Sequence, residues 1–458
     1  MFHSKAPRRA LTRLAASLII LLGPSPLAGG STPDTAAAEP SVSPARRLAD
    51  RLEPELRALV VEALERNPRL RSLEAEARAA AAAAPQAKAL PYATLAMTAY
   101  PAPPETRVGP QRFMASYSQR LPATGKRGLR EQAALQKAAA LTAHVEARRL
   151  ALVTRLRRLT HELGFLDRHE AILHELRQHL LQHEEVARAR YATGLGLGQA
   201  VIKIQADITG VDNQLLGLEQ RRVAIREEIN ALRDRPPAVP LPRFELDPVD
   251  HRDRDLEGLA QTAMTVRPEL AAANAEIAWA DSFTELADKE SKPDWTVGVT
   301  YTYVDRRSDP AGIANPPPDD GDDILGLQGG VVLPFNGARV EGMREEAFAR
   351  RDAAWLARRS VETEIRGDVG DLALRLPLQW NQLRLVEDLL VVQAEESLQS
   401  AQAAYVAGRL NALDLLDAEH VLFETETAIA RAATDYAIRL ADLEGEVGQP
   451  LEQRPGKE

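Results

Sequence analysis

The chain contains no cysteine, so a disulfide, a thiolate metal site and a cysteine nucleophile are all excluded. Aromatic residues make up only 4% of its 458 residues, although the hydrophobic set reaches 45%. A composition rich in Ala, Leu, Arg and Glu but poor in aromatics favours long helices over a compact mixed core. The sequence also lacks a glycine-rich phosphate loop and a Ser/His/Asp set in a plausible context. We therefore expect no enzyme and no cofactor.

Long hydrophobic runs are missing as well. Residues 1–28 combine four basic residues with the short apolar run "LAASLIILLG" and the small residues of "PSPLAGG", which predicts a secretory signal peptide. No later stretch approaches the about 18 apolar residues of a membrane helix, so membrane insertion would require β-strands. Without cysteine we expect no N-terminal lipid anchor. Loss of residues 1–28 makes the formal charge of −9 more negative, which argues against nucleic acid as a partner.

Three short phrases occur twice in the same order. The pairs are "NPRLRSLEAE" from Asn67 with "RPELAAANAE" from Arg267, "LPATGKR" from Leu121 with "LPFNGAR" from Leu333, and Tyr-x-x-Gly from Tyr191 and from Tyr405. The spacing within each pair indicates an old duplication of about 200 residues per copy.

Each copy predicts the same order of elements. In the first copy, residues 55–234, we expect a helix over 55–89, strands over 92–100 and 112–120, a long helix over 126–190 and a shorter helix to 232. In the second copy, residues 255–447, we expect a helix over 256–291, strands over 295–304 and 324–333, a long helix over 339–404 and a shorter helix to 447. The remaining parts are an N-terminal periplasmic segment (29–54), a proline-rich linker (235–254) and a C-terminal tail (448–458). At 1.5 Å per residue each long helix reaches about 100 Å, which implies an elongated bundle or tube.

The segment "WTVGVTYTYV" from Trp295 alternates strictly between apolar and small polar residues. Its length and aromatic ends are typical of an outer-membrane strand, whereas a half-exposed hairpin of a water-soluble protein shows the same alternation. Four strands cannot close a membrane barrel, because even the smallest have about eight. If these strands are transmembrane, several chains must share one barrel.

These features together resemble the outer-membrane efflux protein (TolC-like) family over about residues 50–450. The most specific segments are Tyr191-Ala-Thr-Gly194, Tyr405-Val-Ala-Gly408 with "LDLLDAE", and "QRLPATGKRG" from Gln119. The last segment is similar to the heavy-metal (cobalt–zinc–cadmium type) efflux branch. The resemblance implies a mainly α fold of tandem helix-strand-strand-helix-turn-helix repeats. Three such chains would form a twelve-stranded outer-membrane barrel on a periplasmic α-helical tunnel.

The resemblance also implies a function. It is the passive outer-membrane channel of a tripartite efflux system, with divalent heavy-metal cations as cargo and with drugs or other small organic molecules as the alternative. The expected partners are two further copies of the chain, a periplasmic adaptor (membrane fusion) protein, an inner-membrane proton-driven pump and outer-membrane lipid. An alternative of a different class is a soluble periplasmic coiled-coil structural or adaptor protein.

In that family each Tyr-x-x-Gly phrase is the hairpin at the periplasmic end of the tunnel. Gly194 and Gly408 fit helix C-terminal positions, where a left-handed conformation costs glycine little. Asn411 and Asp414 stand three apart, as a helix N-cap and its acidic partner do. The first copy has Leu197 and an alanine in their places, so we expect its hairpin to be held more by packing than by capping.

Two functions are conceivable for the polar side chains near the hairpins. His179 and His183 stand four apart on the long helix, a spacing that can hold one metal ion, and Asp417 and His420 could add ligands. A solvated polar helix face is the favoured alternative for these histidines. Asp414 and Asp417, repeated by symmetry, could form acidic rings that gate the tunnel mouth, although capping is the favoured role for Asp414.

Two further expectations concern backbone order. Pro377 in the second long helix corresponds to Gly164 in the first, which predicts that both helices bend near their middles, unless these are unrelated tolerated substitutions. The loop over residues 305–323 contains six aspartates, and we expect it to be external, solvated and disordered.

Overall fold

The computed structural model describes residues 43–194, 197–244, 251 and 255–451. The predicted signal peptide lies outside the described residues, as do parts of the predicted N-terminal segment, linker and tail. Residues 44–458 form one structural unit, which contains every helix and strand of the described residues. None of these helices combines the length and hydropathy that crossing a membrane would require.

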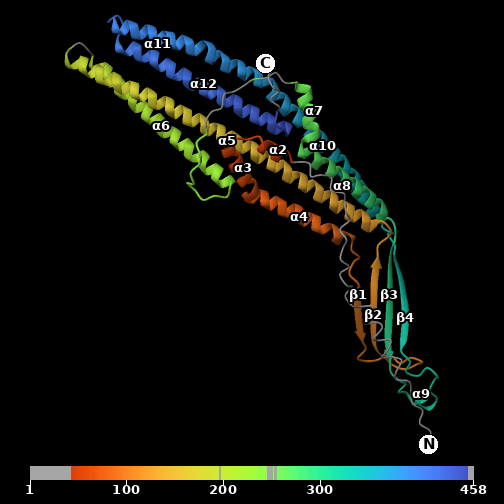
Figure 1. Ribbon diagram of the computed structural model, residues 1–458. Helices are drawn as coiled ribbons and strands as arrows, with labels where there is room; N and C mark the ends of the chain where they lie inside the picture. The colour runs from red at the N-terminus through yellow and green to blue at the C-terminus, as the bar shows by residue number, and fades with distance from the viewer. Residues whose placement is uncertain (1–42, 195–196, 245–250, 252–254, 452–458) are drawn as a thin grey trace. The chain divides into compact units, whose positions relative to one another are not determined.

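The two halves of this unit have the same order of elements (Figure 1). The first half comprises α2 (Pro44–Ala49), α3 (Pro54–Arg66), α4 (Pro68–Lys88), β1 (Thr94–Ala99), β2 (Gln111–Leu121), α5 (Lys126–Ala192) and α6 (Gly198–Leu232). The second comprises α7 (Leu256–Val266), α8 (Pro268–Glu290), β3 (Asp294–Val304), α9 (Pro310–Ala314), β4 (Ile324–Val332), α10 (Gly337–Leu385), a π-helical turn (Val386–Leu390), α11 (Val391–Val406) and α12 (Ala412–Val447). In the described chain α2, α9 and the π-helical turn have no counterpart in the other half.

The helices expected over 55–89 and 256–291 are each broken in two, so those two predictions were wrong. Pro68 and Pro268 begin α4 and α8, and the residue before each proline is extended, with ψ of 117° at Asn67 and 125° at Arg267. The cause is steric, because proline disfavours helical conformation in the residue that precedes it but fits the first turn of a new helix.

Each break is joined to the last helix of its own half. The side-chain amide of Asn67 donates to the carbonyl of Leu232, at 2.9 Å, near the end of α6. The guanidinium of Arg267 donates to the carbonyl of Gly445, at 3.1 Å, and to the carboxylate of Glu446, at 2.7 Å, near the end of α12. The two halves therefore use the same connection, built from different side chains.

Neither Gly164 nor Pro377 ends its helix, and the bends expected at these two residues stay a prediction. Helix α5 runs for 67 residues through Gly164. In the second half Pro377 lies inside α10, and the departure from α-helical hydrogen bonding is the turn Val386–Leu390. Helix α10 packs against both α8 and α12, and this packing maintains it in spite of the amide hydrogen that proline lacks.

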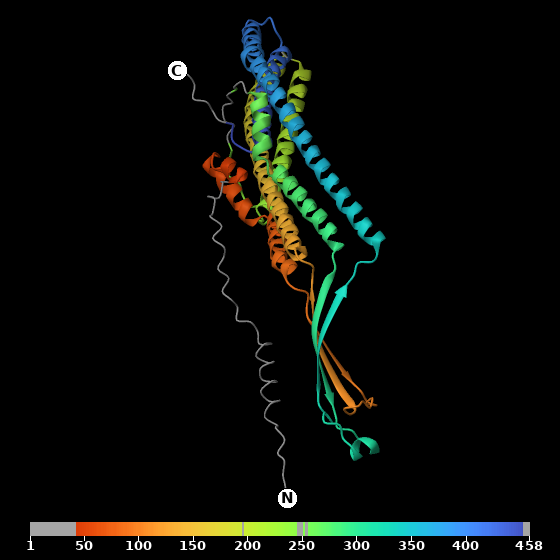
Figure 2. The same ribbon diagram turned by 90° about the vertical axis from the view of Figure 1, so that its right-hand side faces the viewer.

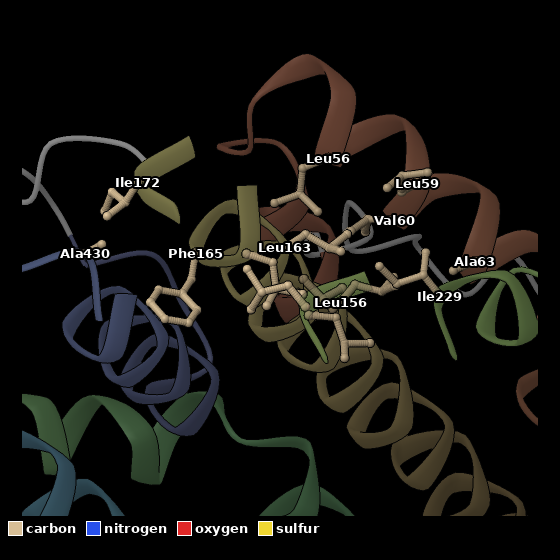
Figure 3. Packing of buried hydrophobic residues seen from close by; sticks show 14 of the residues in the cluster. Leu56, Leu59, Val60, Ala63, Leu156, Leu163, Phe165, Ile172, Ile229 and Ala430 are labelled. Atoms are coloured by element: carbon tan, nitrogen blue, oxygen red, sulfur yellow. The ribbon is translucent and has the colours of Figure 1, made fainter. Parts of the chain in front are cut away.

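Helix α5 is the centre of the helical layer, because it packs against α4, α6, α8 and α12. Helices α2 and α3 cover its middle, where Leu59 and Val60 of α3 face Leu156 and Leu163 of α5 (Figure 3). Phe165 points to the other side, toward α12. A second apolar cluster joins α7, α8, α10 and α12, with Tyr436 fully buried in it.

The four strands form one antiparallel sheet in the order β1-β2-β3-β4, which extends beyond the helices (Figures 1 and 2). Partnered residues of neighbouring strands lie on the same face of a sheet. One such row consists of Leu95, Tyr117, Val299 and Leu327, whose exposed fractions are 67%, 40%, 37% and 89%. The next row on this face, two residues along, is Met97, Ala115, Tyr301 and Leu325.

The opposite face of the sheet carries small and polar side chains. Its rows include Ser118 with Gly298 and Gln328, and Ser116 with Thr300. The alternation of apolar and small polar residues in the segment from Trp295 therefore continues across the sheet, with the apolar side chains on one face and the small and polar ones on the other. Within the described residues β1 and β4 each pair with one strand only, so both outer edges keep unpaired backbone groups.

The acidic loop between β3 and β4 is ordered, so the prediction of a disordered loop was wrong. Asp309 accepts from the amide of Gly312 at 3.2 Å and thereby caps α9. Asp319 pairs with Arg107 of the neighbouring β1–β2 loop, and the amide of Gly321 donates to the carbonyl of Val108 at 2.8 Å. The number of aspartates alone does not reveal that arginine side chains and backbone amides partner them.

Candidate functional site: the helical hairpins and their interface

Both helical hairpins turn at the end of the helices that lies away from the strands (Figures 1 and 2). Gly194 after α5 has φ of 75° and Gly408 after α11 has φ of 69°, the left-handed conformation that was expected of both. The amide of Gly194 donates to the carbonyl of Tyr191, and that of Gly408 to Tyr405, each at 3.0 Å. A side chain at these two positions would be strained whatever the free space.

The second helix of each hairpin begins differently. The side-chain oxygen of Asn411 accepts from the amides of Leu413, at 2.8 Å, and Asp414, at 3.0 Å, and so caps α12. Leu197 precedes α6 and provides no side-chain hydrogen bond there. Asp414 is exposed in the first turn of α12, where a carboxylate is favoured by the helix dipole. The expected difference between the two hairpins is present at their caps.

Two contacts join the first hairpin to the second near the turns. The guanidinium of Arg190 lies 4.7 Å from the ring centroid of Tyr405, a cation–π distance. The ammonium of Lys203 on α6 lies 3.1 Å from the carboxylate of Asp417 on α12. Asp417, predicted as a gate residue, therefore has a partner within its own chain, and the exposed pair contributes about 0–1 kcal/mol.

The predicted histidine pair faces a residue that was not singled out from the sequence. Nε2 of His183 lies 2.9 and 3.0 Å from the two carboxylate oxygens of Glu419, and Nδ1 of His179 lies 3.6 Å from one of them. The Glu419 side chain is only 4% exposed. A signal existed, because Glu419 follows Leu416 by three residues and precedes Phe423 by four, on the apolar face of α12.

The structure does not assemble the predicted metal-contact residues at one place. Asp417 pairs with Lys203, and His420 lines a separate cavity that does not include His179 or His183. In the part of the chain that the structure describes, no group of three or more His, Asp or Glu side chains could hold a metal ion.

Burial also distinguishes the other histidines of α5. Desolvation, with Arg157 nearby, lowers the pKa of His161 to about 4. Burial beside Arg221 lowers the pKa of His169 as well. Both imidazoles are therefore neutral at pH 7. His174, by contrast, is exposed.

The "LPATGKR" phrase lies at the junction between the helices and the sheet. Gly125, with φ of 90°, precedes α5, and Lys126 is 2% exposed. The Lys126 ammonium donates to the carboxylate of Asp294 at 2.9 Å, to the carbonyl of Lys292 at 3.0 Å and to the carboxylate of Glu290 at 3.3 Å. The side chain thus joins the start of α5 to the end of α8 and the start of β3, and so connects the two halves.

Known proteins are similar to this chain in sequence and in structure. Residues 259–449 match the model of the family described as outer membrane efflux protein. No curated protein matches the sequence. The outer membrane protein VceC from Vibrio cholerae is 22% identical with a TM-score of 0.70, over 87% of this chain and 97% of VceC. CusC is 18% identical with a TM-score of 0.73, over 87% of this chain and 93% of CusC.

A further similar structure is the open state of the MtrE outer membrane channel from Neisseria gonorrhoeae. It is 19% identical with a TM-score of 0.67, over 87% of this chain and 90% of MtrE. At such identities the likeness establishes a shared fold. That fold extends over both halves of the chain, whereas the family model covers the second half.

Proposed function

We propose that the chain, whose residues 259–449 match outer membrane efflux proteins, is one subunit of the outer-membrane channel of a tripartite efflux system. The channel is passive and conducts its cargo from the periplasm to the exterior. The sheet lies in the outer membrane and the helices in the periplasm.

The observation that carries this proposal is the apolar face of the sheet. Its central row includes Leu327, which is 89% exposed, and Leu95, which is 67% exposed. Large contiguous apolar patches on a protein surface mark contact with a membrane or a partner. Outer-membrane strands combine such a face toward lipid with a polar face toward the lumen, and this sheet has that polar face as well.

The open edges support a shared barrel. Sheet edges inside a bilayer are costly, because lipid offers no hydrogen-bond partner to backbone amides and carbonyls. Pairing β4 of one copy with β1 of the next satisfies both edges, and three copies supply twelve strands. We therefore infer a homotrimer with a closed twelve-stranded barrel.

The hairpin ends are the proposed periplasmic aperture. A trimer brings together six hairpins and repeats the exposed carboxylates of Asp414 and Asp417 around one axis. These hairpins are the surface that we assign to a periplasmic adaptor protein, and an inner-membrane proton-driven pump supplies the energy. Asp417 is the proposed gate residue, held toward α6 by Lys203 at rest.

The cargo that we propose is a divalent metal cation. Rings of carboxylates at a pore mouth favour cations, and conduction requires contacts weak enough to release the ion. In the proposed trimer the exposed Asp414 and Asp417 would form such rings, and among the described residues neither belongs to a group of three or more side chains that could hold a metal. The same electrostatics admits small organic cations, which are the second candidate.

Membrane fractionation followed by extraction in a mild detergent tests the channel proposal. We expect the mature protein in the outer-membrane fraction, as a heat-modifiable oligomer of about three times the protomer mass. A monomer in the soluble periplasmic fraction would refute it and favour the coiled-coil adaptor alternative.

A complementation assay tests the cargo. We expect the chain, expressed with a proton-driven metal pump and its adaptor in a strain without its own efflux duct, to raise resistance to zinc, cobalt or cadmium. The double variant Asp414→Asn/Asp417→Asn should reduce that gain while membrane levels remain equal. Resistance gained only toward organic compounds would replace the metal cargo with the second candidate.

A further inference from the structure

A cavity of about 340 Å³ lies among α5, α6 and α12, the helices that form the bodies of the two hairpins. Part of its wall is apolar, with Leu173 and Leu176 of α5, Val211 of α6 and Phe423 of α12. At 1.5 Å per residue, His169 in this wall lies ~35 Å from the end of α5, well away from the hairpin turns. From there the cavity reaches toward the proposed aperture, because His420 in the same wall lies three residues after Asp417 on α12.

Three buried polar atoms in this cavity have no hydrogen-bond partner among the described residues. They are Nδ1 of His169, Oδ2 of Asp207 and Nε2 of His420, one from each of the three helices. Buried polar atoms are nearly always satisfied, because an unsatisfied one has lost its hydrogen bonds to water without gaining others. Three at one cavity, from three separate elements, indicate that the cavity takes a polar occupant.

The chemistry of these atoms restricts the occupant. The carboxylate of Asp207 only accepts hydrogen bonds, so the occupant must donate there. His169 is neutral at pH 7, because burial beside Arg221 lowers its pKa, and a neutral imidazole can accept at Nδ1. Glu424 on α12 adds a second carboxylate to the wall, so the cavity favours positive charge.

Metal ions fit this cavity poorly, because none of its His, Asp and Glu side chains belongs to a group of three or more that could hold one. An organic ion spans a wider site and also covers the apolar wall. We propose that the cavity is a binding site for an organic cation with N–H donors, an ammonium or amidinium group on an apolar or aromatic body. The cationic group lies at Asp207, and the apolar body lies against Leu176 and Phe423.

The bound cation joins the two halves of the chain, since α5 and α6 come from the first half and α12 from the second. It therefore stabilises the packing of one hairpin against the other. The inference does not depend on the proposed channel, because binding is measured on the isolated protein and fails or succeeds whether or not the protein conducts.

The test uses 4′,6-diamidino-2-phenylindole, an aromatic amidine whose fluorescence rises when it is sheltered from water. We expect saturable binding to the full-length protein in dodecyl maltoside. Asp207→Asn keeps the shape of the side chain but removes its charge, and should weaken binding about ten-fold or more. His169→Ala and His420→Ala, on the other two helices, should weaken it as well.

Two controls identify the site and the chemistry. Asp212→Asn changes another carboxylate of α6, one that pairs with Arg177 outside the cavity, and should leave the affinity unchanged. Tetraphenylphosphonium is an aromatic cation without N–H donors, and should compete with the amidine only weakly. The proposal is overturned if binding is not saturable, if Asp207→Asn binds as tightly as the wild type, or if tetraphenylphosphonium competes as well as the amidine itself.

Discussion

The buried ammonium of Lys126 provides the sharpest test of how the helices are joined to the sheet. Lys126→Met replaces the ammonium with an apolar group of similar length, so packing changes little. What remains is the Asp294 carboxylate, 6% exposed, with the Arg120 guanidinium at 2.8 Å and the Ala123 amide at 3.0 Å as its partners. Glu290 keeps its pairing with Arg130 at 3.0 Å.

The magnitude follows from the burial of the pair. Removing one partner of a buried ion pair costs about 3–5 kcal/mol, because the other charge stays desolvated without its compensation. Arg120 and the Ala123 amide still stabilise Asp294, so we expect a cost near 3 kcal/mol, at the lower end of that range. Replacing both partners, in Lys126→Met/Asp294→Leu, should recover part of the loss, because no buried charge is then left unpaired.

The assay is unfolding of the detergent-solubilised protein, followed by helical circular dichroism in urea and by heating. Lys137→Met is the matched control, since Lys137 lies on the same helix but is exposed, and it should change stability by less than about 0.5 kcal/mol. Two results would refute the reasoning: a Lys126→Met protein as stable as the control, or a double variant less stable than Lys126→Met alone.

Three smaller predictions concern the hairpins and the external loop. Asn411→Ala removes the cap of α12 and should cost about 1 kcal/mol, seen as faster amide exchange in its first turn; unchanged exchange would contradict the capping role. Asp417→Ala should raise single-channel conductance in a planar bilayer, whereas Lys203→Ala, which keeps the carboxylate, should raise it less; unchanged conductance in Asp417→Ala would remove it from the gate. Hydrogen bonds from their arginine partners are the chief cause of the lowered pKa of Asp309 and of Asp319. Both carboxylates therefore stabilise the loop fully above the ordinary aspartate pKa of about 3.9, and this stabilisation is lost as the pH falls through their pKa values in the folded protein. Cleavage of the loop by an acid-active protease should therefore rise at low pH, and should depend less on pH when both residues are asparagine; equal pH dependence would contradict this.

Features that depend on local chemistry could be predicted from the sequence. Strand alternation reflects the two-residue period of an extended chain, and the left-handed glycines and the Asn411 cap reflect preferences of single residues. The breaks at Asn67 and Arg267 were equally local and were missed, although each precedes a proline. The duplication, read from three repeated phrases, predicted the same element order in both halves of the chain.

Only the tertiary structure decided which distant side chains meet. Glu419 lies 236 residues from His183 in the sequence, and Asp294 lies 168 from Lys126, so no local pattern predicts either contact. For the same reason the sequence favoured a solvated helix face for the histidine pair, with a metal-contact group as the other reading, and neither showed that Glu419 lies beside both histidines. Helix periodicity predicts which face of a helix is buried, but the neighbour that covers this face depends on the packing of the whole chain.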